Sequence, residues 1–89
     1  MKFKTKYLII DKMQYKLLGK YIQEQRKSLG YTLNGFSIEN DIDPAIMSRI
    51  ENLQQNIKLN VLEKIAKGFN KTPAEFLTDF ENKSIKMVR

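Results

Sequence analysis

Apolar residues along this chain recur at helical spacing, and the segments that carry them are separated by residues that favour helix ends. The first segment has a stripe of side chains three or four residues apart, formed by Leu18, Ile22, Gln25 and Leu29 and flanked by Tyr15 and Tyr21. Asp11 and Gln14 have the spacing of a capping box at its start, and Gly30 is suited to its end. We therefore expect a first helix that begins after Asp11 and ends at Gly30.

A second, shorter segment follows, with the sequence TLNGFSIEN. Thr32 is suited to cap a helix there, although Asn34, Gly35 and Ser37 all disfavour the helical state. Such a helix depends on tertiary packing, and Phe36 is the side chain that can supply it.

The third segment, DIDPAIMSRIEN, starts with a turn at Asn40 and Asp41, two residue types that tolerate a positive φ. Asp43 is suited to cap the helix that follows, and Pro44 stands at its first position, where the missing N–H costs nothing. Three apolar side chains are expected to face inward: Ile42, Met47 and Ile50.

Two further helices complete the pattern. The fourth is amphipathic, with an inner face of Leu59, Leu62, Ile65, Ala66 and Phe69 and with Lys64 and Lys67 outside. The sequence TPAE, from Thr72 to Glu75, is a full capping box with proline at the first position, and it starts a fifth helix that carries Phe76, Leu77 and Phe80. The pattern predicts a compact all-α domain of five helices over residues 11–80, with a basic arm at 1–10 and a tail at 81–89.

Composition excludes several chemistries. The 89 residues contain no cysteine and no histidine, which rules out disulfides, imidazole catalysis and the common zinc sites. We expect no cofactor, no metal and no enzymatic activity. The only early apolar run, Tyr7 to Ile10, stops at Asp11 and is too short for a signal-peptide core or a membrane span, so a cytoplasmic protein is expected.

The net charge of +6 favours an anionic partner, nucleic acid first. Its distribution is uneven. Residues 1–30 carry a net charge of +6, residues 31–57 a net charge of −3, and residues 58–89 a net charge of +3. The basic character therefore lies on both sides of the third segment and not within it.

Six blocks in order, LGKYIQEQRKSLG, TLNGFS, DID, MSRIEN, LNVLEKIAKGF and TPAEFL, resemble the lambda-repressor-like, or Cro-type, helix-turn-helix family. The resemblance runs from Leu18 to about Leu77. It implies a sequence-specific regulator of transcription that binds double-stranded DNA, most often a repressor on a two-fold operator as a homodimer. It also implies that Arg26 and Glu51 form a structural ion pair between the first and third helices.

In that family the third helix enters the major groove. The resemblance makes Arg49 a candidate for contact with guanine, and it makes Pro44 and Ala45 candidates for apolar contact with a thymine methyl group, while Ser48 is a weak and ambiguous reader. Candidate phosphate contacts lie around this helix: Lys16, Lys20, Asn52, Gln54, Gln55, Asn56 and Lys58.

This chain departs from the family pattern at three places. Leu33 stands where the family has a glutamine that commonly contacts DNA, Asp41 stands where it usually has a turn glycine, and Leu53 stands where it has a glycine after the third helix. Asp41 is tolerable in the turn, whereas Leu53 predicts that the loop after the third helix can follow a different path.

Several alternatives stay open on sequence alone. The arm can be a disordered terminus, a groove-binding segment or a strand that pairs with a second copy. Four apolar residues of the fifth helix and tail are expected to form the dimer surface, with ordinary core or fraying as the alternative: Phe76, Phe80, Ile85 and Val88. The chain can also be an antitoxin that binds a toxin as well as DNA, or a helix-turn-helix retained as a protein-interaction module.

Overall fold

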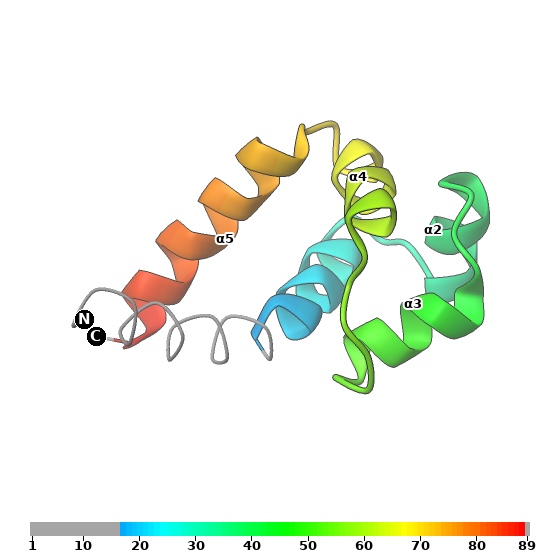
Figure 1. Cartoon of the computed structure of the whole chain (residues 1–89), viewed down its shortest axis with the longest axis horizontal. Helices are drawn as coiled ribbons and strands as arrows, with labels where there is room; N and C mark the ends of the chain where they lie inside the picture. Colours follow the sequence, from blue (N-terminus) through cyan, green and yellow to red (C-terminus); the bar gives the residue numbers. More distant parts are fainter. Residues whose placement is uncertain (1–16, 89) are drawn as a thin grey trace.

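The computed structural model describes the backbone of residues 17–88 and the side chains up to residue 83. Within these residues the chain forms five helices and no strand (Figure 1). A helix over residues 17–28 is followed by α2 (Leu33–Glu39), α3 (Pro44–Glu51), α4 (Leu59–Gly68) and α5 (Pro73–Val88). The all-α prediction is confirmed for this part of the chain. The predicted basic arm, the cap at Asp11 and the candidate Lys16 lie outside the described residues.

The predicted helix starts are formed as expected. The Thr32 hydroxyl accepts a hydrogen bond from Gly35 N at 3.0 Å, and the Asp43 carboxylate accepts one from Ala45 N at 2.9 Å. At α5 the capping box is reciprocal, because Glu75 N donates to Thr72 Oγ1 and Thr72 N donates to Glu75 Oε1. α5 then continues to Val88, beyond the boundary placed at residue 80 from the sequence.

The core is built around a continuous chain of aromatic rings. Neighbouring ring centroids lie 4.9–5.6 Å apart, in the order Tyr31, Phe36, Phe69, Phe76, Tyr21 and Phe80. This chain passes from the turn before α2, across the end of α4, to α5 and the helix over residues 17–28. Ile22, Met47 and Ile65 are fully buried beside it. The short α2 is thus held by Phe36, as its low helix propensity requires.

α5 packs against the core through aromatic side chains. Phe76 and Phe80 are 1% and 3% exposed, so they belong to the core and the prediction that they offer a dimer surface is wrong. The side chains of Ile85 and Val88 lie outside the described set. Lys83 links α5 to the helix over residues 17–28, since its ammonium lies 3.7 Å from a Glu24 carboxylate oxygen and 5.5 Å from the centre of the Tyr21 ring.

Two apolar residues predicted to face inward do not. Leu29 is 58% exposed because the helix ends at residue 28 and the chain turns at Gly30, which has a φ of +81°. Leu59 is 69% exposed because it occupies the first position of α4, before the inner stripe of that helix reaches the core. In both cases a residue at the end of a periodic pattern lies beyond the packed part of the helix.

The helix over residues 17–28 approaches α3 closely at Gly19. A Cβ atom at this position would lie 2.2 Å from the carbonyl oxygen of Ile50, a backbone atom that cannot move aside easily. Gly19 therefore allows the two helices to come together where α3 ends. Within residues 17–88, no helix has both the length and the apolar character needed to cross a membrane.

Candidate functional site

The orientation of α3 depends on a buried ion pair. Arg26 donates from Nε and Nη2 to the two oxygens of Glu51, both at 2.8 Å, and from Nη1 to the carbonyl oxygen of Tyr31 at 2.7 Å. The two side chains are 6% and 1% exposed. The hydrogen bonds to Glu51 raise the pKa of Arg26, so the guanidinium stays charged. One side chain thus joins the helix over residues 17–28 to α3 and to the chain before α2, and the predicted pair is present.

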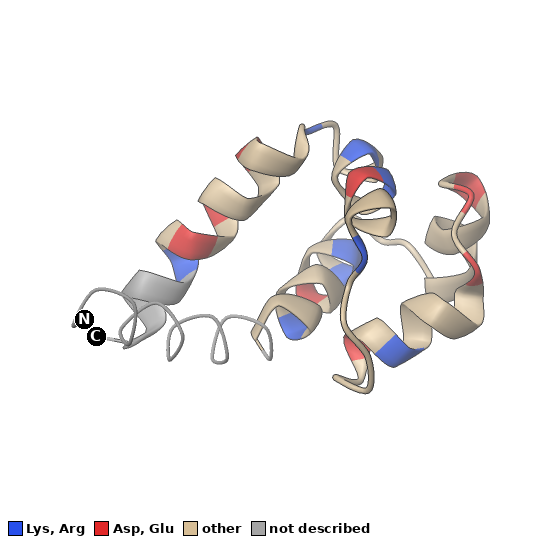
Figure 2. Cartoon of the chain, viewed as in Figure 1, with Lys and Arg blue, Asp and Glu red and all other residues tan. Residues whose placement is uncertain are grey.

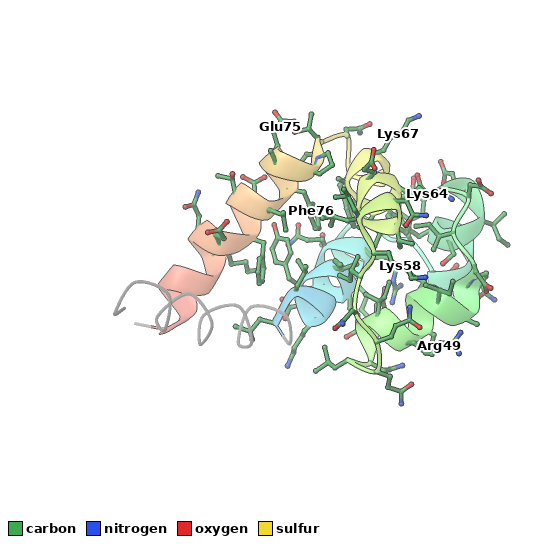
Figure 3. All side chains as sticks on the ribbon, in the orientation of Figure 1. Arg49, Lys58, Lys64, Lys67, Glu75 and Phe76 are labelled. Carbon is green, nitrogen blue, oxygen red and sulfur yellow. The ribbon has the colours of Figure 1, made fainter. Side chains whose placement is uncertain are left out.

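The side of α3 that faces away from the core carries a row of small and polar side chains. Ala45, Ser48, Arg49 and Asn52 follow at the spacing of one helical face, and all are exposed except the half-buried Ser48. Asn52 Nδ2 donates to Ser48 Oγ at 3.3 Å. Arg49 has no ion-pair partner among the described residues, and Figure 3 shows it at this outer surface.

The first turn of α3 has few free hydrogen-bond donors. Pro44 is half-buried and has no N–H, and the N–H of Ala45 is bound to the Asp43 carboxylate. The N–H of Met47 donates to the Asp43 carbonyl oxygen at 3.0 Å. The capping carboxylate repels phosphate at this helix start, and the proline has no N–H that could bind one. What remains for contact there is apolar surface.

α3 ends in a Schellman motif, in which Gln54 N donates to the carbonyl oxygen of Arg49 at 2.8 Å and Leu53 N donates to that of Ile50 at 3.1 Å. Leu53 has a φ of +63°, the left-handed conformation that glycine normally adopts there. The leucine therefore takes the backbone conformation of the glycine that it replaces, at a cost of about 1–2 kcal/mol, and the different loop path stays a prediction.

The segment between α3 and α4 brings further polar groups to the same part of the molecule. Gln54, Asn56 and Lys58 are exposed, and Gln55 is half-buried. Lys58 is the N-cap residue of α4, and its side chain makes no capping hydrogen bond. The positive charge of the lysine therefore lies at the helix end where the helix dipole is also positive. Lys20 is exposed on the helix over residues 17–28.

Figure 2 shows how the charges are distributed over the ribbon. Basic positions occur on the helix over residues 17–28, on α3, on the chain that leads to α4 and on α4 itself. Acidic positions occur around the turn between α2 and α3 and along α5, and also on the helix over residues 17–28, at the end of α3 and on α4. Lys64 is already engaged by that turn, because its ammonium donates to the carbonyl oxygen of Asp41 at 2.9 Å and lies 3.6 Å from the Asp41 carboxylate. The sequence pattern did not reveal this contact, which joins α4 to the turn at Asp41, where φ is +57°.

Leu33, which replaces a glutamine of the family pattern, packs against the core and is half-buried. Its side chain therefore contributes to packing at the start of α2 and offers no hydrogen bond to a partner. Among the described residues no group of three acidic side chains could hold a metal ion.

A scan against protein-family models, a search of curated proteins and a search of solved structures each find no match for this chain. The family resemblance therefore depends on the sequence blocks and on their spacing.

Proposed function

We propose that this protein is a transcriptional regulator that binds double-stranded DNA in a sequence-specific manner, with α2 and α3 as a helix-turn-helix and α3 as the helix that enters the major groove. Repression at a two-fold operator by a homodimer is the mode that the family resemblance favours. The observation that carries the proposal is the side of α3 that faces away from the core. Arg49 lies there without an ion-pair partner among the described residues, and the Arg26–Glu51 pair fixes the orientation of the helix.

The chemistry of this row suits base recognition. An arginine can make two parallel hydrogen bonds to guanine, whereas small neighbours such as Ala45 and Ser48 let the helix approach the base edges. Affinity must come from elsewhere, because residues 31–57 carry a net charge of −3. Lys20 and Lys58 are exposed cations on neighbouring elements, and we assign them to phosphate contacts.

The experiment is a binding selection from random duplex DNA with the full chain, followed by affinity measurements at several salt concentrations. The proposal expects one enriched sequence and an affinity that falls steeply with salt, by about 0.9 in the logarithm of affinity per tenfold change in salt for each phosphate contact. No enrichment, or an affinity that is independent of salt, would contradict it.

A second candidate function is a protein-interaction module. Ile38 is 72% exposed on α2, next to the exposed Glu39, so this part of the surface combines an apolar side chain with negative charge. The same salt series distinguishes the two functions, because apolar contact with a protein does not release the counterions of a phosphate backbone.

A further inference from the structure

The end of α3 is held by the helix that precedes α2. Arg26 binds the Glu51 carboxylate through two hydrogen bonds of 2.8 Å. Gly19 lies so close to α3 that a Cβ atom there would be 2.2 Å from the carbonyl oxygen of Ile50 and 2.9 Å from the side chain of Leu53. Three residues at the end of α3 are thus supported from outside the helix, and side chains that project outward among them are presented by a rigid element.

Asn52 lies between two of these supported residues and is exposed. Its backbone N–H donates to the carbonyl oxygen of Ser48 at 3.0 Å, and its Nδ2 donates to Ser48 Oγ at 3.3 Å. Among the residues that the structure describes, Asn52 Oδ1 accepts no hydrogen bond. The amide is therefore oriented by Ser48 and keeps one N–H and one carbonyl oxygen for a partner.

The hydroxyl group of Ser48 is used differently from those of two other helical serines. Ser28 and Ser37 donate to carbonyl oxygens of their own helices, at 2.8 and 2.7 Å. Ser48 makes no such bond within the described part of the chain, and its Oγ accepts from the Asn52 amide instead. Because Ser48 is half-buried and Asn52 is exposed, the serine supports the amide from the side of the core.

The free groups of the Asn52 amide match the major-groove edge of adenine. Adenine presents a donor, the N6 amino group, beside an acceptor, N7, and asparagine can bind both. Guanine presents two acceptors, O6 and N7, which suit an arginine and not an amide carbonyl. A phosphate also offers acceptors alone, so it would use the N–H of the amide and leave Oδ1 unpaired.

On the basis of the proposed function, we propose that Asn52 selects adenine next to the guanine bound by Arg49, and that Ser48 is the positioning residue for the Asn52 amide. Asn52 Oδ1 accepts from the N6 amino group and Nδ2 donates to N7. Arg49 and Asn52 are three residues apart, about 4.5 Å along the helix axis. Stacked base pairs are about 3.4 Å apart, so the two side chains read neighbouring base pairs. This assignment differs from the phosphate contact that the family resemblance implies for Asn52.

The test uses the duplex that the wild-type protein selects from random DNA. Each adenine of a half-site is replaced in turn by purine, which lacks the N6 amino group, or by 7-deazaadenine, which lacks N7. Binding of each duplex is measured by fluorescence anisotropy. At the adenine beside the guanine whose preference is lost in Arg49→Ala, each replacement should weaken wild-type binding about fivefold, the value of one hydrogen bond.

Variants separate the base contact from its support. In Asn52→Ala both penalties at that adenine should disappear, while the preference for the neighbouring guanine remains. In Ser48→Ala the penalties should shrink to about twofold, because the amide is then free to rotate. Ser48→Thr keeps the hydroxyl group and should restore them. Gln54→Ala, at an exposed position after α3, is the control and should leave the adenine preference unchanged. Thermal unfolding checks that each variant folds.

The outcomes distinguish this inference from the proposed function. A selected sequence without adenine beside that guanine overturns the inference alone, as do equal wild-type affinities for adenine and its two analogues, a result that needs no variant. An Asn52→Ala protein that keeps the preferred sequence and binds all duplexes more weakly also overturns it, in favour of a phosphate contact. Full penalties in Ser48→Ala would overturn the role of Ser48. A wild-type protein that selects no sequence overturns both the inference and the proposed function.

Discussion

α3 and α4 begin with opposite chemistry. At the start of α3 a carboxylate caps the helix and a proline occupies the first position, so a negative charge stands at the positive end of the helix dipole. At the start of α4 the N-cap residue is Lys58, and no side chain closes the helix. Both starts are exposed.

The difference suggests a division of roles between the two helices. An anion is stabilised at a helix start that has free N–H groups and a cation nearby, as at α4. At the start of α3 the Ala45 N–H is bound to the Asp43 carboxylate, and this carboxylate repels anions. In the proposed complex, the contribution of α3 would therefore come from contacts with base edges. In the proposed DNA complex, α4 would therefore position the protein on the backbone and α3 would determine the sequence.

The largest effect is expected from the pair that holds α3 in place. Arg26→Met should lower the free energy of unfolding by about 3–5 kcal/mol, because it leaves the Glu51 carboxylate buried without a partner. The denaturant midpoint is the measurement, and the double variant Arg26→Met with Glu51→Leu should recover part of the loss. A single variant that unfolds at the wild-type midpoint would show that the pair does not stabilise α3.

The second effect concerns another contact at the same end of α3. Gly19→Ala should cost about 1–3 kcal/mol, because the new methyl group would overlap the carbonyl oxygen of Ile50 and push the two helices apart. Ser28→Ala, at an exposed position of the same helix, is the matched control and should change stability little. If both variants melt at the same temperature, the close approach at Gly19 has been overestimated.

The sequence predicted much of this architecture. Local signals sufficed for the caps at Thr32, Asp43 and Thr72, because each depends on residues within one turn. The inward positions of Met47 and Ile50 followed from helical spacing. The pairing of Arg26 with Glu51 came from the family resemblance and not from spacing, since 25 residues separate the two.

The features that the sequence did not predict depend on contacts between distant segments. The exposure of Leu29 and Leu59 is set by where their own helices end and begin relative to the core, which periodicity does not reveal. Phe76 has the same spacing whether it faces a second copy or the aromatic rings of its own chain. The Lys64–Asp41 contact, between residues 23 positions apart, likewise required coordinates.

The third prediction concerns the start of α3, where Asp43 caps the helix. Asp43→Ala removes the cap and should lower the free energy of unfolding by about 0.5–2 kcal/mol. It also removes a negative charge that faces the proposed DNA surface, so non-specific affinity for duplex DNA should rise while stability falls. Thermal unfolding and titration with a random duplex measure the two changes, and a parallel fall in both would contradict the account of this helix start.

The smallest effect is expected at the start of α4, where no side chain caps the helix. Lys58→Ser supplies the missing cap and should stabilise the domain by about 0.5–1 kcal/mol. The same change should weaken DNA binding and reduce the slope of log affinity against log salt by about 0.9 per chain, the value of one phosphate contact. Lys67→Ser, at an exposed position near the end of α4, is the control and should leave the slope unchanged. A variant with unchanged slope would remove Lys58 from the phosphate contacts.

We propose that α3 determines which DNA sequence the protein binds, and a variant of Arg49 gives the most direct test. Binding selections from random duplex DNA are carried out with the wild-type protein, with Arg49→Ala and with Lys20→Ala. We predict that Arg49→Ala loses its preference for guanine at one base pair per half-site, with a cost of about 1–3 kcal/mol on the wild-type duplex. Lys20→Ala should keep the same preferred sequence and bind all duplexes more weakly. An Arg49→Ala protein that selects the wild-type sequence unchanged would contradict the account.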